Sequence, residues 1–476
     1  MSLRYTDRVE VTLIDYGPKS RVSEKQLGPD EVIAIEGAGT FSSVDLLGNA
    51  SEQLSKGKDL RRFSARVHFE STRRGHASLS TSFIPFIEVR WCSRALSMLV
   101  LSTRFGSFLQ ESQRRSFVTE EKLLVPAEVR GTAYEGKVIG VLKGAHDLYN
   151  SLVKDGVEIE DARYLLPLAT ATSFFSASTL ESLIYLLRKA REGYGIVTEE
   201  LRVFARAVHA VLASVAPALV GSRLSFSGQW TEYVPLDPLR SPDGVMETLF
   251  DGSLHQDAKL IDLRVLKGIE EALRERPQLI PHFQSTVEAV VIEAPSLAAY
   301  HQSIRHRTVP TAVESILEAA RRALRDPRRC LVIPPGVRSS ESREAAFTDA
   351  CVRALELHEV LVEEVGPAAS IYLIPQSVRI RTCRVYDLFN LLSPLGFVAT
   401  RTCSASQWEE RAIAYKVWRE VETVAPWLGS LMGEKCRHLG YCPEREWCPI
   451  ILKYRAYSDE EHAIHNRPRE PPEQRD

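Results

Sequence analysis

Residues 202–217 (RVFARAVHAVLASVAP) and residues 411–426 (RAIAYKVWREVETVAP) align without a gap, 209 positions apart. Both stretches carry apolar residues at three- and four-residue spacing, which is typical of an amphipathic helix, and both end in Val-Ala-Pro. A match of this length between distant parts of one chain indicates an internal duplication. If further segments match in the same order, the duplication extends to the whole chain.

Three further pairs of anchors keep the same order, with offsets between 203 and 208 positions. They are residues 75–78 (GHAS) with 281–284 (PHFQ), Arg104 with Arg307, and residues 165–167 (LLP) with 373–375 (LIP). Random matches would not preserve both order and spacing. The sequence therefore predicts a first copy over residues 1–222 and a second over 223–457, followed by a charged, Pro-rich tail, 458–476, that we expect to be disordered.

Each copy mixes strand and helix patterns, which predicts an α+β fold built twice. Alternating apolar residues predict strands over 9–15 and 83–89, and helical periodicity predicts helices over 179–190, 199–214, 311–324 and 407–423.

The composition argues against several classes of protein. The 476 residues include 60 Lys and Arg against 62 Asp and Glu, a net charge of -2, and 44% are hydrophobic. No strong basic excess marks a nucleic-acid binder, and no apolar run reaches the ~20 residues that span a bilayer. The N-terminus has no apolar stretch of the signal-peptide kind, so we expect a soluble cytoplasmic protein.

Arg305, His306 and Arg307 form the sharpest local motif. Three adjacent cationic or cationisable side chains before a helical pattern suit an anionic ligand, because guanidinium forks match phosphate oxygens and a helix N-terminus adds donors. The alternative interpretation is a solvated basic turn. The equivalent segment of the first copy, residues 102–115, has the sequence STRFGSFLQESQRR.

These segments resemble the flavin-dependent thymidylate synthases, whose signature is RHRxxSxNExSxRY. A GHxS segment precedes that signature in the family, an ARxxLP segment follows it, and an arginine lies six residues before the Gln of an AQWEIR-like segment. The corresponding features here are residues 75–78 (GHAS), Ser107, Ser112, Arg114, residues 162–167 (ARYLLP), Arg401 and residues 406–411 (SQWEER).

Both copies depart from the signature, and their losses are complementary. The first copy lacks the RHR and has Leu109, Gln110 and Arg115 in place of Asn, Glu and Tyr. The second copy keeps the RHR, but Pro310, Ala312 and Val313 replace Ser, Asn and Glu, and only Ser315 survives among the later positions. Arg163 has Ile371 as its counterpart, and Arg401 has Glu192. One composite site for each pair of copies is therefore expected.

The resemblance implies roles for the retained residues. It assigns FAD binding to the RHR residues, His76 and Asn390, and dUMP binding to Ser112, Arg114, Arg163 and Arg401. It also implies hydride transfer from reduced flavin, methylenetetrahydrofolate as carbon donor, NADPH as reductant and no covalent nucleophile from the protein. Because the family forms homotetramers with sites between subunits, a homodimer of this chain would rebuild the tetramer.

Structural interpretations remain open for some of these residues. His76 could be a buried histidine bonded to backbone. Ser112 and Arg114 could cap and charge a helix. Asn390 could be a polar helix residue.

Cys436, Cys442 and Cys448 form a C-x5-C-x5-C arrangement in a turn-rich segment. Three thiolates there could bind zinc or an iron–sulfur centre, with His438 or Cys403 as fourth ligand. The spacing is not that of paired C-x2-C zinc knuckles, so unligated thiols packed in a C-terminal loop are the alternative.

The leading functional hypothesis is a flavin-dependent thymidylate synthase-like enzyme that methylates dUMP at C5. Two alternatives stay open: a non-catalytic paralogue that binds flavin or nucleotide, and the same chemistry on another uridine-containing substrate.

Overall fold

The computed structural model describes residues 3–22, 24–41, 45–57, 59–226, 234, 236–250, 257–445 and 447–465. The chain forms two compact units, and each is made of two separate stretches of sequence. Unit 1 comprises Met1–Asp243 and Ser315–Val378, and unit 2 comprises Gly244–Glu314 and Arg379–Asp476. The units therefore do not coincide with the predicted copies, because residues 315–378 of the second copy pack with the first.

Unit 1 is built around an antiparallel sheet in the order β2-β5-β8-β6. Its strands are β2 (Glu10–Gly17), β5 (Ile84–Ser93), β8 (Ala171–Ser178) and β6 (Gly106–Gln110), with β1 (Arg4–Tyr5) paired to β7 (Leu124–Val125) and β3 (Ser20–Val22) paired to β4 (Lys25–Leu27). The first two of these sheet strands confirm the strands predicted over 9–15 and 83–89.

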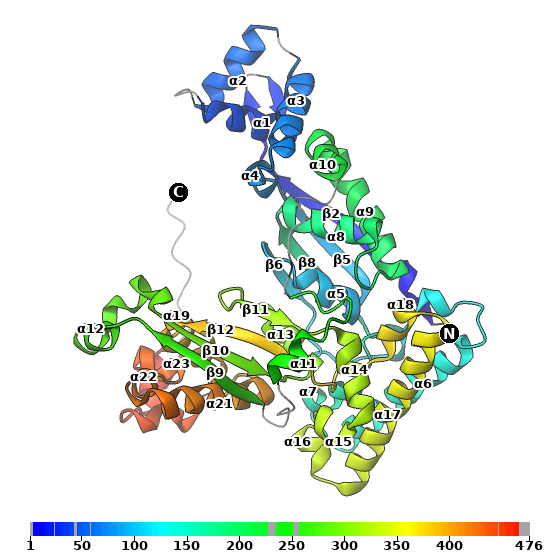
Figure 1. The fold of residues 1–476 in the computed structure, drawn as a ribbon, viewed down its shortest axis with the longest axis vertical. Helices are drawn as coiled ribbons and strands as arrows, with labels where there is room; N and C mark the ends of the chain where they lie inside the picture. Colours follow the sequence, from blue (N-terminus) through cyan, green and yellow to red (C-terminus); the bar gives the residue numbers. More distant parts are fainter. Residues whose placement is uncertain are drawn as a thin grey trace. The chain divides into compact units, whose positions relative to one another are not determined.

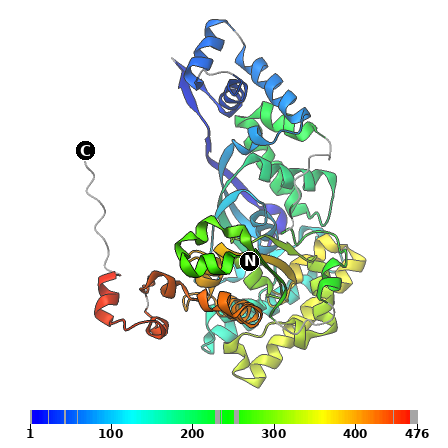
Figure 2. The same ribbon diagram turned by 60° about the vertical axis from the view of Figure 1, so that its left-hand side comes forward.

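Helices of the first copy lie at both ends of unit 1 and, as α5, α8 and α9, beside its sheet (Figure 1). Figures 1 and 2 show α1, α2 and α3 at one end of the unit and α6 at the other, where α14 and α17 of the second copy also lie. The first-copy helices are α1 (Pro29–Gly39), α2 (Leu46–Ser55), α3 (Leu60–Arg73), α4 (Ser78–Thr81), α5 (Arg94–Leu101), α6 (Glu135–Lys154), α7 (Ile159–Ala162), α8 (Leu180–Glu192), α9 (Glu199–Val215) and α10 (Pro217–Ser225).

The second copy adds α14 (Ile316–Arg325), α15 (Pro327–Cys330), α16 (Pro335–Arg338), α17 (Glu341–Glu364) and α18 (Pro367–Ser370) to unit 1. Short 3-10 turns complete it: η1 (Thr6–Arg8), η2 (Glu120–Lys122), η3 (Ala127–Val129), η4 (Arg163–Leu165) and η7 (Ile371–Leu373).

Unit 2 repeats the architecture with the antiparallel sheet β11-β12-β10-β9. Its strands are β9 (Ala258–Val265), β10 (Val287–Glu293), β11 (Thr311–Val313) and β12 (Thr382–Asp387). Its helices are α11 (Val245–Phe250), α12 (Ile269–Glu275), η5 (Pro277–His282), η6 (Gln284–Thr286), α13 (Leu297–Ser303), α19 (Leu388–Leu392), α20 (Phe397–Arg401), α21 (Trp408–Val424), α22 (Pro426–Leu431), α23 (Lys435–Leu439), η8 (Pro449–Lys453) and α24 (Asp459–His465). The apolar face of α21 packs on β9 and β10 through Ile413, Val417 and Val421, as its periodicity predicts.

Equivalent backbone groups of the two copies bond to each other inside unit 1. Leu168 N–H donates to Ile374 O (3.0 Å), and 208 positions later Gln376 N–H donates to Leu166 O (3.0 Å). In the same way, residues 169 and 377 donate to the carbonyls of residues 372 and 164, at 2.8 Å each. This reciprocal pairing has local two-fold symmetry, as contacts between identical subunits of a dimer do. Together with α17 packed on α6, it explains why residues 315–378 join unit 1.

Two predicted segments differ from the structure. Residues 311–313 form strand β11 on the edge of β12, so the helix predicted over 311–324 begins only at Ile316. Residues 459–465 of the predicted disordered tail form α24, where Glu461 Oε2 accepts from Ser458 N–H (3.0 Å) and His465 stacks on Tyr441. The rest of the tail, 466–476, lies outside the described residues.

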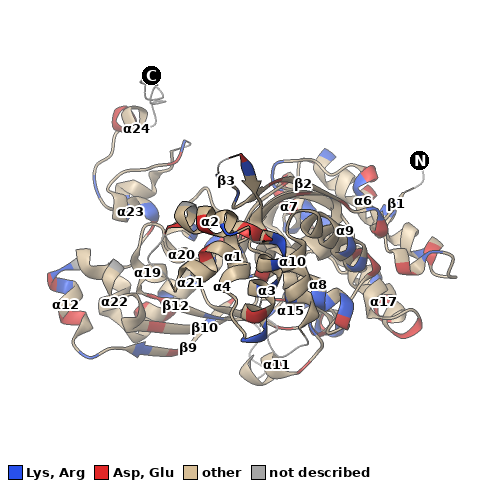
Figure 3. Ribbon diagram, turned by 90° about the horizontal axis from the view of Figure 1, so that it is seen from above, with Lys and Arg blue, Asp and Glu red and all other residues tan. Residues whose placement is uncertain are grey.

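Charge is dispersed over the described part of the chain. Figure 3 shows Lys and Arg mixed with Asp and Glu along the helices, as in α12, which agrees with the near-neutral composition. No helix among the described residues is long and apolar enough to cross a bilayer.

Candidate functional site

The turn between α13 and β11 carries the RHR residues in unit 2. His306 N–H donates to Ser303 O (2.9 Å), which folds the chain back directly after the helix. The sequence predicted a helix immediately after this motif, but β11 follows instead, so no helix N-terminus adds donors at this point. The cationic side chains are therefore presented by a turn.

His306 is held as a neutral imidazole. Arg401 Nε–H donates to His306 Nε2 (2.7 Å), which requires the ring proton to sit on Nδ1. Burial, followed by the charges of Arg401, Arg384 and Arg305, lowers the pKa of His306 to about 3. Arg401 is in turn paired with Glu410 (2.8 Å). The structure thus brings together two residues that the sequence placed in the site, His306 and Arg401.

Arg305 and Arg307 provide the positive charge of this turn. Arg305 is exposed and has no ion-pair partner among the described residues. Although Arg305 reaches solvent, partial desolvation by the surrounding protein and then the charge of Arg401 lower its pKa, while burial lowers the pKa of Arg307 to about 10. Partly desolvated positive charges favour an anionic ligand, and an anion would also relieve the repulsion between Arg305 and Arg401. The donor set therefore fits the phosphates of a dinucleotide cofactor.

A buried network of polar and aromatic side chains packs against His306. The sequence analysis did not predict it. Arg384 on β12 pairs with Glu293 on β10 (3.0 Å) and donates to Ser303 Oγ (2.5 Å). The Phe397 ring lies 5.2 Å from the Arg384 guanidinium and 5.1 Å from the His306 ring. The alternation of β12 places Arg384 on a buried face, a position that is normally apolar, and this was the available signal.

Asn390 lies in the same region, fully buried on α19. Its Nδ2 donates to Thr308 O (3.0 Å) and its Oδ1 accepts from Thr308 Oγ1 (3.0 Å). The oxygen and the nitrogen of the Asn390 amide therefore both bond to Thr308, the residue that follows the RHR motif. In this structure Asn390 positions the turn.

The residues predicted to bind nucleotide in the first copy lie in unit 1. Ser112 and Arg114 sit in a turn after β6, where Arg115 N–H donates to Ser112 O (3.0 Å), so they do not cap a helix. Arg114 makes a two-pronged contact with Glu160 (2.7 and 3.1 Å). The buried Arg163 Nε donates to Glu160 O (3.2 Å). Glu160 therefore brings Arg114 and Arg163 together.

His76 is exposed, which excludes the buried-histidine interpretation. It lines a groove of about 420 Å³ together with Phe41, Arg66 and Arg74, side chains of the region that holds α1 and α3. Ser112, Arg114 and Arg163 do not line this groove.

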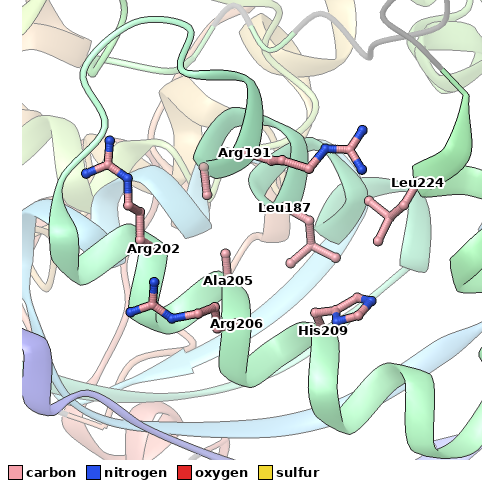
Figure 4. Close-up of a pocket in the computed structure, with 8 residues that line it drawn as sticks. Leu187, Arg191, Arg202, Ala205, Arg206, His209 and Leu224 are labelled. Atoms are coloured by element: carbon pink, nitrogen blue, oxygen red, sulfur yellow. The ribbon is translucent and has the colours of Figure 1, made fainter.

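A second groove of about 380 Å³ lies among α8, α9 and α10 (Figure 4). Its cationic lining includes Arg202 and Arg206, both paired with Glu199 (3.8 and 2.9 Å). None of the residues predicted from the sequence lines it.

The three clustered cysteines share one pocket in unit 2 with Cys403 and not with His438. Burial, Glu434 and the other three thiols raise the pKa of Cys436 to about 11. No three His, Cys, Asp or Glu side chains in the described ranges converge closely enough to hold a single metal ion.

The fold and the site define a duplicated α+β protein with a cationic turn in unit 2. The family model described as thymidylate synthase complementing protein matches residues 21–218 and 279–427. The chain therefore belongs to this family, and both copies are covered.

Two curated relatives are named flavin-dependent thymidylate synthase. The protein from Pyrococcus abyssi is 28% identical over 167 residues, which are 33% of this chain and 65% of the relative. The protein from Geobacter sulfurreducens is 30% identical over 154 residues, which are 32% of this chain and 63% of the relative. The matches thus span slightly less than two thirds of these relatives.

Among solved structures, a UMP/dUMP methylase from Streptomyces cacaoi, bound with 5-Br dUMP, is 19% identical. The alignment covers 48% of this chain and 98% of that chain, with a TM-score of 0.34.

Proposed function

We propose that this protein is a flavin-dependent thymidylate synthase-like enzyme that methylates dUMP at C5. Methylenetetrahydrofolate is the carbon donor, and NADPH reduces the bound FAD. The observation that carries the proposal is the complementary retention of motifs: unit 2 holds the RHR turn with Arg401, and unit 1 holds Ser112, Arg114 and Arg163.

The flavin would bind at the RHR turn. Arg305, exposed and unpaired among the described residues, together with Arg307, supplies the charge for the pyrophosphate, and the neutral His306 offers its Nδ1–H as a directed donor. Bound and reduced, the flavin supplies the hydride of the reaction. The exposed His76 is a further cofactor contact in this proposal.

The nucleotide phosphate would be recognised by Ser112, Arg114, Arg163 and Arg401. Guanidinium groups match phosphate oxygens geometrically, and the Ser112 hydroxyl is exposed and can donate to a remaining oxygen. The protein contributes positioning and charge complementarity and needs no covalent nucleophile. We further propose that two chains assemble as a homodimer. The locally two-fold pairing of the copies within one chain supports this proposal, because two such chains would bring four copies together.

The test uses the purified full chain. Flavin content is measured first, and release of tritium from dUMP labelled at C5 is then followed with NADPH and methylenetetrahydrofolate. We expect bound FAD and tritium release that requires both co-substrates. Protein that neither carries nor binds FAD, and that releases no tritium, rules the proposal out.

A non-catalytic paralogue is the second candidate, and the ion pairs of the nucleotide-side arginines favour it. A phosphate must compete with Glu160 for Arg114 and with Glu410 for Arg401. If the chain binds FAD stoichiometrically but releases no tritium from any uridine substrate, it is a non-catalytic paralogue.

The third possibility is that the same chemistry acts on another uridine-containing substrate. The same assay distinguishes it from the first when other substrates are offered. Gln110, which replaces the signature Glu, donates to Ser97 Oγ (3.0 Å) and so differs chemically from a carboxylate. Turnover of UMP or of uridine in RNA, without turnover of dUMP, would identify this case.

A further inference from the structure

Four of the eight cysteines line one pocket in unit 2, and they come from separate stretches of chain. Cys403 follows α20, Cys436 lies on α23, and Cys442 and Cys448 lie in the loops between α23 and η8. Cys436 and Cys442 are buried, the other two are half-buried, and all four are free thiols. The fold therefore gathers around one space cysteines that are up to 45 positions apart in the sequence.

We propose that Cys403, Cys436, Cys442 and Cys448 bind an iron–sulfur cluster. Four thiolates are the usual ligand set of a [4Fe–4S] cluster, and each thiolate binds a different iron at a corner of the cube. The proposal is independent of the proposed function, because it concerns a pocket that contains none of the residues assigned to flavin or nucleotide.

A single zinc ion and an iron–sulfur cluster place different demands on four thiolates. Four thiolates on one zinc lie within about 4 Å of one another, because each Zn–S bond is about 2.3 Å. Among the described side chains no such convergence exists, yet the four thiols line a common pocket. The pocket that they line measures about 10 Å³, so the geometry does not choose between the two centres, and the experiment below measures zinc as well as iron and sulfide.

The immediate surroundings are compatible with an anionic centre. Lys435, Glu434 and Glu444 line the pocket. Glu444 pairs with Lys435 (2.8 Å) and Glu434 with Lys453 (3.3 Å), so a lysine balances each carboxylate beside the thiols. Cys403 Sγ already lies 3.7 Å from a Glu444 oxygen, close to the same ion pair. A cluster carried by four thiolates has a net negative charge, which would compete with Glu444 for the charge of Lys435.

A metal centre would also stabilise the C-terminal segment. Its small apolar core is made of Cys436, Cys442, Ile451 and Tyr457, with three half-buried residues packed against it. A core of this size supplies little stability alone, and small natural folds use metal centres or disulfides to compensate. Ligation by Cys403 would fasten this segment to the loop that precedes α21.

The experiment is elemental analysis of the full chain purified under anaerobic conditions. Iron and acid-labile sulfide are measured per chain, because flavin would mask a cluster in the visible spectrum. We expect about four irons and four sulfides per chain, and an electron paramagnetic resonance signal after reduction with dithionite. About one zinc per chain with no sulfide overturns the proposal. Absence of iron after incubation with ferrous iron and sulfide overturns it too.

Variants test the four ligands individually. Cys403→Ala and Cys442→Ala should each lose most of the iron and sulfide. Cys383→Ala, a half-buried cysteine of unit 2 outside the pocket, and His438→Ala should retain them. Circular dichroism and gel filtration check that each variant is folded. Full iron content in folded Cys403→Ala and Cys442→Ala overturns the ligand assignment, and if those variants do not fold, the analysis of the unmodified chain decides.

Discussion

Arg305 presents an exposed guanidinium with no ion-pair partner among the described residues, next to two further cationic side chains. If the RHR turn holds the flavin phosphates, Arg305→Ala removes a charge-assisted hydrogen bond worth about 1.5–3 kcal/mol. We therefore expect FAD to bind about ten- to a hundredfold more weakly, measured by titrating the flavin-free full chain. The control is Arg274→Ala, since Arg274 is another exposed arginine of unit 2 and pairs with Glu270 on α12. Equal affinity in both variants would place the flavin elsewhere.

His306 gives the stability of the protein a defined pH dependence. Its folded-state pKa of about 3 lies below the ordinary value of 6.5, so the unfolded chain takes up the proton first. Stability is therefore fully present above about pH 6.5 and falls as the pH is lowered toward 3. Between pH 7.5 and 5 the unmodified protein should lose about 1–2 kcal/mol more than His306→Gln, whose side-chain oxygen can still accept from Arg401.

Urea denaturation followed by tryptophan fluorescence measures this difference, because Trp418 and Trp427 pack against the unit 2 core. The same loss of stability in both proteins would show that His306 is already protonated or solvated in the folded state.

The sequence predicted the charged surface of this site but not its support. Residues 305–307 and Arg401 belong to motifs that can be matched by position. Arg384, Glu293 and Phe397 lie at strand and helix positions whose pattern alone predicts ordinary core residues, and their pairing depends on the register of β10 and β12. The ion pairs of Arg114 with Glu160 and of Arg401 with Glu410 are also tertiary, so the sequence could not indicate them.

At the scale of elements, equivalent helices of the two copies begin with the same arrangement, a serine N-cap that is bonded to a buried glutamate. Ser93 caps α5 and donates to the buried Glu200, while Ser296 caps α13 and donates to the buried Glu409, each at 2.6 Å. Burial raises the pKa of Glu200 to about 7, and Tyr372 OH donates to the same carboxyl group (2.9 Å). Each serine hydroxyl therefore accepts a hydrogen bond from the first turn of its helix and donates one to a buried carboxyl group.

Ser93→Ala and Ser296→Ala should each destabilise their own helix by about 1–2 kcal/mol, since both a cap and a bond to a buried carboxyl are lost. Hydrogen-exchange mass spectrometry should show faster exchange over residues 94–101 in the first variant and over 297–303 in the second. Ser430→Ala, which alters an exposed hydroxyl bonded only to Trp427 O among the described residues, is the control. Exchange that is unchanged in both helices would show that the caps carry no stability.

Element boundaries were predictable where the local pattern and the tertiary contacts agree. Strands β2 and β5 and helices α8, α9 and α21 lie close to their predicted ranges. The helix predicted over 311–324 lost its first residues because Thr311, Ala312 and Val313 pair with β12, a long-range contact that overrides helical periodicity. Helix α24 formed in a charged tail because His462 and His465 find aromatic partners upstream.

At the scale of the whole molecule, the repeat was visible in the sequence, but the compact units were not. The offsets of the anchors indicate where the copies match, and they say nothing about which copy each helix packs against. That choice is made by residues 164–169 and 372–377, whose backbone groups bond reciprocally between copies. A boundary drawn between residues 222 and 223 therefore separates segments that share one core.

This packing predicts how the chain can be divided. Residues 1–226 alone keep every motif of the first copy but lose the partners of four backbone groups, the contact of α6 with α17, and the hydrogen bond from Tyr372 to Glu200. Each buried polar group left without a partner costs about 1–3 kcal/mol, which together approaches the whole stability of a domain. We expect this fragment to self-associate or aggregate, and gel filtration with circular dichroism would detect it.

A second fragment, residues 1–243 joined to 315–378 by a short Gly/Ser linker, should instead fold as a monomer. The joined ends already meet, because Ser315 Oγ donates to Arg240 O (2.8 Å) and Ile316 N–H donates to Pro238 O (2.9 Å). The linker therefore closes a short gap at little entropic cost, and unit 1 keeps all of its internal hydrogen bonds. A cooperative melting transition is expected for this fragment only. If residues 1–226 also melt cooperatively as a monomer, the first copy is an autonomous domain, and the reciprocal pairing with residues 372–377 contributes little to its stability.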